Sequence, residues 1–275
     1  MGIDKNIWIR WQQQRLRALH APIELATPLA QKLQLNNDNI YTKADPATNT
    51  CKCQNNFKDC IAYLCQHDYK QVGDIPTRDC TAKDGMNWDL ETIAVDMHNY
   101  YRRLVATGWA MEKKGGYAPT AKDMYSVKYA DCTGADTLAQ DTKTKVTDCP
   151  STAPTPDVGR SLNYYYVTRY DIPEEQLLQE VAIKKWASQV TEIGVGKENI
   201  FVQNGPVTNY ANMVHDKVQN LACAIDICTK TGASAVACQY DTPPIDSDPI
   251  YQMGKPCKCT GTRKCSPLQG LCVLP

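Results

Sequence analysis

Apolar side chains in the middle of the chain recur at helical spacing in two long segments. The first segment starts at Asn87, where Asp89 is expected to cap a helix, and ends at Gly108. A spacing of three or four residues places one apolar stripe along that helix. The stripe consists of Leu90, Ile93, Met97, Tyr101, Leu104 and Val105.

The second segment has clearer signals at its start. Asp171 is expected to cap this helix, Pro173 lies in the first turn, and Glu174 and Glu175 face the positive end of the helix dipole. These features predict a second long helix. Its apolar stripe consists of Leu177, Leu178, Val181, Ala182, Trp186 and Val190.

Shorter elements are predicted around this helix. A further helix is expected from Thr208 to Leu221, followed by strands over Ala222–Cys228 and Ser234–Tyr240 with a glycine-containing turn between them. A short helical stretch is expected at 125–129. Residues 131–163 are rich in Thr, Asp, Ser and Pro and are expected to form a loop.

This mixture of helices and strands predicts a layered α/β sandwich that is large enough to bury its own core. Residues 1–38 contain no cysteine and are interpreted as poorly ordered or foreign to the domain. Residues 39–74 form a cysteine-rich, hinge-like segment, 75–248 form the folded domain, and 249–275 form a second cysteine-rich segment. This last segment is too short for a core, so its cysteines must hold it together.

Cysteine is the most unusual part of the composition. The chain has 14 cysteines, an even number that favours disulfides and an oxidising, extracellular compartment. Zinc is the competing explanation, but Cys-x-Cys followed by unequal gaps does not match the Cys-x2-Cys pairs of a zinc ribbon. All of them are therefore expected to form disulfides, with Cys132 and Cys149 joined across the loop. The set is Cys51, Cys53, Cys60, Cys65, Cys80, Cys132, Cys149, Cys223, Cys228, Cys238, Cys257, Cys259, Cys265 and Cys272.

Charge and hydropathy exclude several classes of partner. The 30 basic and 30 acidic side chains cancel, so there is no electrostatic footprint for nucleic acid or for an anionic membrane surface. No apolar run approaches the roughly 20 residues of a membrane-spanning helix. Residues 1–17 carry charges and glutamines, and no apolar segment follows them, which does not match a signal peptide. A secreted protein with this start is expected to be a fragment or to begin with non-native residues.

Several motifs resemble the CAP superfamily of cysteine-rich secretory, antigen 5 and pathogenesis-related 1 proteins. Met97–Arg102 resembles the first-helix signature of that family, and Gly115–Pro119 is similar to its nematode branch, the activation-associated secreted or venom allergen-like proteins. The Trp186 helix, Asn209–Val214 and Ala237–Tyr240 agree in the correct order. The resemblance implies a three-layer α-β-α sandwich with a disulfide-rich C-terminal hinge. It also implies structural roles for His98, Asn99, Arg102 and Trp186.

Two-domain members of this family join one such unit to another through a hinge. Residues 39–65 repeat the cysteine pattern of the C-terminal segment and resemble the hinge of a preceding domain. The chain is therefore expected to be the C-terminal half of a tandem protein whose first domain carries the signal peptide. An unrelated cysteine-rich extension is the alternative.

The resemblance also implies a central cleft, in which two histidines and two glutamates hold a divalent metal in many members. This sequence departs from that pattern at each position. Gln189 stands where a glutamate is expected, and Asn209 stands where a histidine is expected. The other two positions fall in Cys149–Thr152, which has no histidine, and in Gly159–Asn163, which has no glutamate. Neutral amides bind transition metals poorly, so we expect no metal and no cofactor.

The histidines and cysteines also predict no catalytic arrangement. Of the 4 histidines, His98 is expected to be a hydrogen-bonded structural residue and His215 a surface residue. No Gly-x-Ser-x-Gly elbow occurs, and paired cysteines leave no thiol nucleophile. We therefore expect no enzymatic activity and no catalytic residues.

A tyrosine-rich stretch from Asn163 to Tyr170 is the main candidate for ligand binding. A strand whose alternate tyrosines pack on the core explains it structurally, whereas an aromatic surface for a protein partner explains it functionally. Aromatic loops in this region bind sterols in some CAP proteins, which gives a third interpretation. The candidate residues are Tyr164, Tyr165, Tyr166 and Tyr170.

Taken with the resemblance, these features favour a secreted, non-enzymatic protein of a parasitic nematode. It is expected to bind a host protein or receptor and to modulate host immunity or haemostasis. The Asn209 segment and the lost cleft ligands resemble hookworm inhibitors directed at integrins, so an integrin is the candidate receptor. A sterol or lipid carrier is the alternative, and a metal-dependent hydrolase is less favoured.

Overall fold

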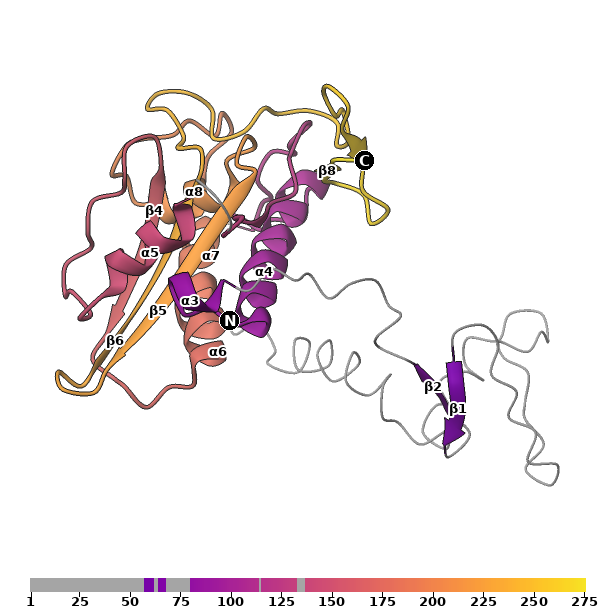
Figure 1. The fold of residues 1–275 in the computed structure, drawn as a ribbon. Helices are drawn as coiled ribbons and strands as arrows, with labels where there is room; N and C mark the ends of the chain where they lie inside the picture. The colour runs from indigo at the N-terminus through magenta and orange to yellow at the C-terminus, as the bar shows by residue number, and fades with distance from the viewer. Residues whose placement is uncertain (1–56, 62–63, 68–79, 114, 133–136) are drawn as a thin grey trace. The chain divides into compact units, whose positions relative to one another are not determined.

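The computed structural model describes residues 57–61, 64–67, 80–113, 115–132 and 137–275 (Figure 1). The chain divides into two units, Met1–Ile75 and Pro76–Pro275. In the first unit, strand β1 (Phe57–Ile61) pairs antiparallel with β2 (Leu64–His67). The predicted segment 1–38 lies outside the described residues, and the domain boundaries stay predictions. The side chains of four predicted disulfide cysteines lie outside the described part of the structure: Cys51, Cys53, Cys60 and Cys65.

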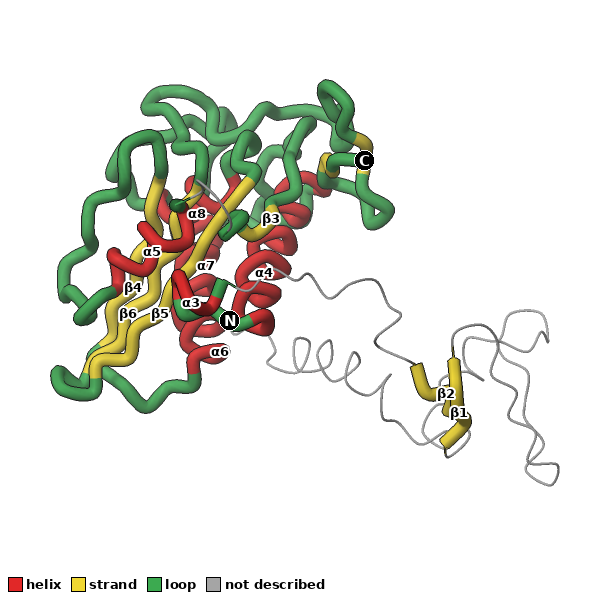
Figure 2. Tube along the Cα trace, viewed as in Figure 1, coloured by secondary structure: helices red, strands yellow, loops and turns green. Residues whose placement is uncertain are grey.

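The second unit is built on a four-stranded mixed sheet (Figure 2). In spatial order, its strands are β3 (Lys128–Tyr129), β5 (Asn220–Cys228), β6 (Ala233–Tyr240) and β4 (Ser161–Val167). β3 runs parallel to β5, whereas β6 is antiparallel to both of its neighbours. The two strands predicted at the end of the domain are thus confirmed as β5 and β6, each starting slightly earlier than expected.

Helices cover both faces of this sheet, which gives the three-layer α-β-α sandwich that the resemblance implied (Figure 1). One face carries α3 (Thr81–Asp84) and α5 (Leu138–Val146). The other carries α4 (Trp88–Thr107), α8 (Thr208–Val214) and one continuous run made of α6 (Glu174–Gln176), the π-helical η3 (Leu177–Ile183) and α7 (Lys184–Glu192). In the part of the chain that is described, no helix combines the length and apolar character needed to cross a bilayer.

Strand β6 is buried along its whole length because its two faces meet different helical layers. Ala235 and Ala237 belong to a core cluster with Val146 of α5, and their small side chains let that helix lie close to the sheet. On the other face, the Tyr240 hydroxyl meets Nε2 of His98 on α4 at 2.8 Å. The alternation of the strand therefore divides its residues between two cores.

The described cysteines form five disulfides. Cys132 bonds Cys80 and Cys149 bonds Cys228, so the predicted staple between Cys132 and Cys149 is wrong. Helix α5 separates these two cysteines and brings each of them to a different partner. The remaining pairs are Cys223–Cys238, Cys257–Cys265 and Cys259–Cys272.

Both long helices are confirmed, but both predicted N-caps are wrong. Asn87, rather than Asp89, caps α4, because its Oδ1 accepts a hydrogen bond from the Leu90 N–H at 2.9 Å. Asp171 does not cap the second helix, because its carboxylate receives two hydrogen bonds of 2.9 Å from the Arg169 guanidinium.

The helical stretch predicted at 125–129 is also wrong, since this segment leads into strand β3. The side chain of Asn99 on α4 acts like the edge of a strand here. Its Nδ2 donates to the Val127 carbonyl at 2.8 Å, and its Oδ1 accepts from the Val127 N–H at 2.9 Å. This pairing holds the backbone extended next to β5 and prevents a helical turn.

The loop predicted over 131–163 contains helix α5. The buried face of α5 consists of Leu138, Ala139, Thr142 and Val146. Thr142 is polar, and its hydroxyl is satisfied inside the helix by donating to the Leu138 carbonyl at 2.6 Å. Because the polar residue Thr142 occupies one position of the buried stripe, the apolar residues alone do not show helical spacing, and the helix was not predicted.

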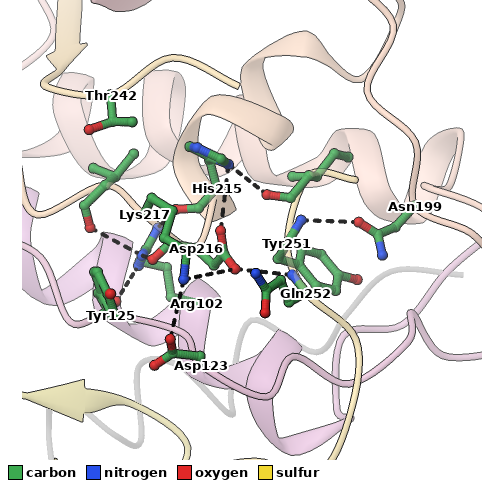
Figure 3. Close-up of polar contacts among 12 residues, drawn as sticks. Arg102, Asp123, Tyr125, Asn199, His215, Asp216, Lys217, Thr242, Tyr251 and Gln252 are labelled. Carbon is green, nitrogen blue, oxygen red and sulfur yellow. Dashed lines mark hydrogen bonds and ion pairs between the residues drawn. The ribbon is translucent and has the colours of Figure 1, made fainter. Parts of the chain in front are cut away.

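Arg102 joins helix α4 to two distant segments of the chain (Figure 3). Its side chain is fully buried, and its guanidinium nitrogens donate only to backbone carbonyl groups. Burial lowers the pKa of Arg102 to about 10, which leaves it charged at neutral pH. The accepting carbonyls are those of Tyr125, Met213, His215, Asp216 and Val218, at 2.8–3.3 Å.

These contacts explain why α8 ends at Val214, not at Leu221 as predicted. Arg102 Nη1 donates to the carbonyl oxygens of Met213 and His215 at 2.9 and 2.8 Å. These carbonyls are therefore satisfied without the N–H groups that a further helical turn would supply. The chain then turns and enters β5.

The C-terminal segment 249–275 is fastened to the domain through two buried carboxylates. Asp216 accepts the Gln252 N–H at 3.0 Å (Figure 3). Asp123 accepts the Thr260 hydroxyl at 2.7 Å. Both carboxylates lie in the domain, so the segment packs against it as part of the same unit. The segment ends in a small sheet of β7 (Lys264–Cys265) and β8 (Cys272–Val273).

Replacing Arg102 by leucine is expected to lower the free energy of unfolding by about 3 to 5 kcal/mol, because buried carbonyl groups lose their donors. Urea unfolding without reductant measures this loss. Arg103→Leu is the control, because Arg103 makes a single exposed hydrogen bond to Gln269. Equal losses in the two variants would contradict the role given to Arg102.

Candidate functional site

A cavity of about 760 Å³ opens where β4, α8 and three loops meet. This volume lies within the usual range of small-molecule sites. Its wall combines aromatic and proline rings with amide and hydroxyl groups. The polar side chains of the wall are Thr155, Arg160, Ser161, Gln203, Asn204, Thr208, Asn209, Asn212 and Asp246.

Two residues singled out from the sequence, Tyr164 and Asn209, line this cavity. Gln189, which stands at the expected glutamate position, has another role. Its Oε1 accepts the backbone N–H of Tyr210 at 2.8 Å, in the first turn of α8. The N-cap residue of that helix, Val207, offers no side-chain cap. Gln189 therefore supplies the missing cap from the neighbouring helix.

Arg160 brings a positive charge to the cavity wall, and two carboxylates neutralise it. Its Nη1 lies 2.7 Å from Asp141 and 3.8 Å from Asp157. Asp157 also receives the Lys145 ammonium at 2.7 Å. The guanidinium is thus committed to a network beside the cavity.

A chain of hydrogen bonds leads from the cavity wall into the core. Asn212 Nδ2 donates to Asn163 Oδ1 at 3.0 Å, and Asn163 Nδ2 donates to the Tyr240 hydroxyl at 3.0 Å. That hydroxyl donates to Nε2 of His98, whose Nδ1–H faces the Ala94 carbonyl at 2.7 Å. Each side chain of this chain is hydrogen-bonded to the next, so together they hold α8, the sheet and α4 in one arrangement.

His98 is buried and neutral. Burial lowers the pKa of His98 to about 4, and the charge of Arg102 acts in the same direction. Both of its ring nitrogens are engaged, and Tyr240 separates it from the cavity wall. His98 therefore has no route to a substrate in the cavity.

The tyrosine-rich stretch forms β4 and does not present a single aromatic surface. Tyr164 and Tyr166 are half-buried against the core cluster under α5, and the Tyr164 hydroxyl donates to the Pro150 carbonyl. Burial raises the pKa of Tyr164 to about 12. Tyr165, half-buried, alternates with them along the strand, and Tyr170 is 53% exposed in the turn that follows.

The prediction that His215 is a surface residue is wrong. Its side chain is only 12% exposed, and Nδ1 donates to the Ile250 carbonyl at 2.7 Å (Figure 3). Burial lowers the pKa of His215. This histidine holds the start of the C-terminal segment in place. Its Nδ1 is engaged with a backbone carbonyl, so His215 is not a candidate catalytic residue.

The cavity does not fit the divalent metal that the family pattern implies. Its wall has no imidazole and a single carboxylate, that of Asp246, beside amides, hydroxyls and a paired arginine. Elsewhere in the described residues, three groups of Cys and Asp lie close enough to share an ion. Each of these groups contains both sulfurs of one disulfide, and disulfide sulfurs are not thiolate ligands.

Sequence reasoning did not assign roles to Asn163 and Asn212, which connect the cavity to the core. One signal was available. In β4 the polar residues Ser161 and Asn163 alternate with larger side chains and both are buried. A buried asparagine in a strand requires a polar partner, and the partner's identity depends on the tertiary fold.

The architecture defines a class of protein: an α-β-α sandwich with a cavity at its edge strand and a disulfide-held C-terminal segment. The sequence pattern of the Cysteine-rich secretory protein family (CAP) matches residues 95–240, which include the whole four-stranded sheet. The chain belongs to this family.

Similar proteins come from the nematode branch that the motifs indicated. Hookworm platelet inhibitor 1 of Ancylostoma caninum is 26% identical over 179 residues, which is 65% of this chain and 76% of that protein. The crystal structure of NaASP2 with Zn2+ has a TM-score of 0.60 and 28% identity, over 68% of this chain and 97% of that one. The crystal structure of Na-ASP-1 has a TM-score of 0.64 and 26% identity; the match covers 80% of this chain but only 57% of Na-ASP-1.

The wild-type chain is expected to retain no stoichiometric zinc after incubation with the metal and gel filtration, measured by elemental analysis. The double variant Gln189→Glu/Asn209→His, which restores two of the expected ligand types, should bind more zinc than the wild type. One tightly held zinc per wild-type chain would contradict the absence of a metal site.

His98 is expected to make stability depend on acid. Since its folded-state pKa of about 4 lies below the unfolded value of 6.5, the unfolded chain binds a proton first as the pH falls. The stabilisation is complete above pH 6.5, and about 3 kcal/mol is lost as the pH falls to 4. Urea unfolding across this range should show a smaller loss for His98→Gln, and identical slopes would contradict this assignment.

Proposed function

We propose that this chain is an extracellular, non-enzymatic protein of a parasitic nematode that binds a host protein or cell-surface receptor and thereby modulates immunity or haemostasis. The observation that carries the proposal is an exposed apolar surface on the hairpin that follows α4. We call it the hairpin face, and it consists of Trp109, Met111 and Tyr117.

The hairpin face results from the strand geometry. Met111 pairs with Tyr117 across an antiparallel bridge, and Trp109 lies two residues before Met111, so all three point to the same side. Trp109 is 65% exposed, Met111 is 52% exposed and Tyr117 is 54% exposed. The intervening Ala110 is buried and points to the core. The two aromatic rings meet edge to face, with centroids 6.1 Å apart.

The hairpin is anchored to the domain by three hydrogen bonds. Its Glu112 carboxylate accepts the N–H groups of Val195 and Gly196 at 2.7 and 3.0 Å, and the Lys113 N–H donates to the Val190 carbonyl at 3.3 Å. A rigid surface loses little conformational entropy when a partner binds. Tryptophan and tyrosine are also the residues that most often dominate the energy of protein interfaces.

The known relatives support a host partner. One of them carries the name Hookworm platelet inhibitor 1. The five disulfides of the described residues suit an oxidising, extracellular compartment. An integrin on platelets or leukocytes is therefore the first receptor class to test.

An enzymatic role has little support among the described residues. His98 is enclosed in the core and His215 is bonded to a backbone carbonyl, so neither is placed to activate a nucleophile. Every cysteine whose side chain is described is in a disulfide. The sterol-carrier alternative is also weak, because the wall of the cavity carries many polar groups.

The double variant Trp109→Ser/Tyr117→Ser is expected to bind host platelets or neutrophils about a hundredfold more weakly than the wild type, because two aromatic anchors are lost. Flow cytometry with the fluorescently labelled full chain measures this binding. Trp88→Ser is the matched control, since Trp88 is 54% exposed at the opposite end of α4.

Equal binding by the double variant and the wild type would remove the hairpin face from the proposal. No binding of the wild type to either cell type or to purified integrins would contradict the proposed function. Retention of labelled cholesterol by the wild type would favour the carrier alternative.

A further inference from the structure

The cavity beside β4 differs chemically from the apolar hairpin face, because its wall carries polar side chains. Those of its polar side chains that have no partner are neutral. The amides of Gln203, Asn204 and Asn209 make no hydrogen bonds to other described side chains or backbone groups. Ser161 lines the same wall; its Oγ is buried and has no hydrogen-bond partner within the described structure. A buried hydroxyl without a partner is uncommon in folded proteins and indicates a position where a ligand or water completes the bonding.

Both charged side chains of the cavity wall, Arg160 and Asp246, already have partners. The Arg160 guanidinium is paired with Asp141 at 2.7 Å. The Asp246 carboxylate accepts the Gln203 N–H at 2.7 Å and the Ser247 hydroxyl at 3.3 Å. A strongly charged ligand would therefore meet groups that already have partners.

Apolar side chains, most of them with rings, line the rest of the wall. Tyr164 is fixed by the hydrogen bond from its hydroxyl to the Pro150 carbonyl, and Phe201 lies in the loop that precedes α8. Four prolines complete this apolar part. Flat apolar surfaces next to amides and hydroxyls match a molecule with apolar C–H faces and hydroxyl edges.

Two other ligand classes fit less well. A sterol would cover the free amides of Asn204 and Asn209 without bonding them, and burying unpaired polar groups weakens binding. An extended peptide could add to the edge strand β4, but side chains already occupy its outer carbonyls. Asn212 Nδ2 donates to the Leu162 carbonyl at 3.3 Å and Trp186 Nε1 to the Tyr164 carbonyl at 3.4 Å.

We propose that this cavity binds a neutral sugar unit of a glycan. The amides of Asn204 and Asn209 and the hydroxyl of Ser161 bond the sugar hydroxyls, because each of these groups can both donate and accept. The ring of Tyr164 packs on a C–H face of the sugar. Binding needs no metal, in contrast to the chemistry expected of a cleft with histidines and glutamates.

The test uses the full chain on an array of immobilised lactose, N-acetyllactosamine, mannotriose and chitotriose, with sialylated and sulfated versions of the same sugars. Titration calorimetry then measures affinity for the best free oligosaccharide, with and without a chelator. Asn209→Leu is expected to weaken that affinity about tenfold, because sugar hydroxyls lose one bonding partner. Gln176→Leu is the control, because Gln176 is an exposed amide on α6 outside the cavity.

Asn204→Gly provides a second variant in case Asn209→Leu disturbs α8, because glycine removes the amide and tolerates the left-handed backbone of this position (φ 57°). Binding of at least one neutral sugar, lost in parallel in both variants and unaffected by chelator, is the expected result. Absence of binding to every neutral sugar, or equal affinity in wild type and both variants, would overturn the proposal. Binding restricted to the charged versions would overturn it too.

The glycan proposal and the receptor proposal can be tested independently of each other. The Trp109→Ser/Tyr117→Ser variant should keep its sugar affinity, because the hairpin face is not part of the cavity wall. Cell binding that survives in Asn209→Leu would leave the hairpin face as the receptor site.

Discussion

The buried guanidinium of Arg102 is the contact on which most of this domain depends. It donates to carbonyl groups in the segments that precede β3 and β5, and thereby ends α8 and directs the chain into β5. A lysine could not do this, because an ammonium group lacks the planar fork of donors that reaches several carbonyls at once. Asp216, in the same turn, holds the C-terminal segment through Gln252. The positions of the cavity and of the disulfide-held tail both follow from this turn.

The domain keeps the layered fold of the family with amides at positions where the resemblance implies metal ligands. Gln189 occupies a position where the family resemblance implies a glutamate, and its oxygen caps α8 through the Tyr210 N–H. Asn163 connects the wall to Tyr240 and so to His98 in the core. The bonded amides thus serve the fold, while unbonded amides such as Asn209 remain open to a ligand.

The sequence allowed much of the fold to be predicted, and the errors have physical causes. Long apolar stripes predicted α4 and the α6–α7 run, and alternating residues predicted β5 and β6. Helix α5 was missed because Thr142 is buried in its stripe, and β3 was missed because its extended backbone depends on the side chain of Asn99. In both cases a polar side chain is buried or paired through hydrogen bonds that depend on the folded structure. Sequence patterns that count only apolar residues therefore miss it. The cavity residues Tyr164 and Asn209 were named from the sequence, and Ser161 lies in the segment Gly159–Asn163 where a cleft position was expected.

The sequence by itself determined the family, the layered α/β class and the abundance of disulfides, because motifs, periodicity and cysteine number are local or compositional properties. The disulfide partners were decided only by the tertiary structure, since Cys132 and Cys149 each bond a cysteine from a distant part of the chain. The same holds for the exposure of Trp109 and Tyr117 and for the burial of His215. Exposure, pairing and pKa depend on which groups the fold brings within a few ångströms, and neighbours in space are not neighbours in sequence.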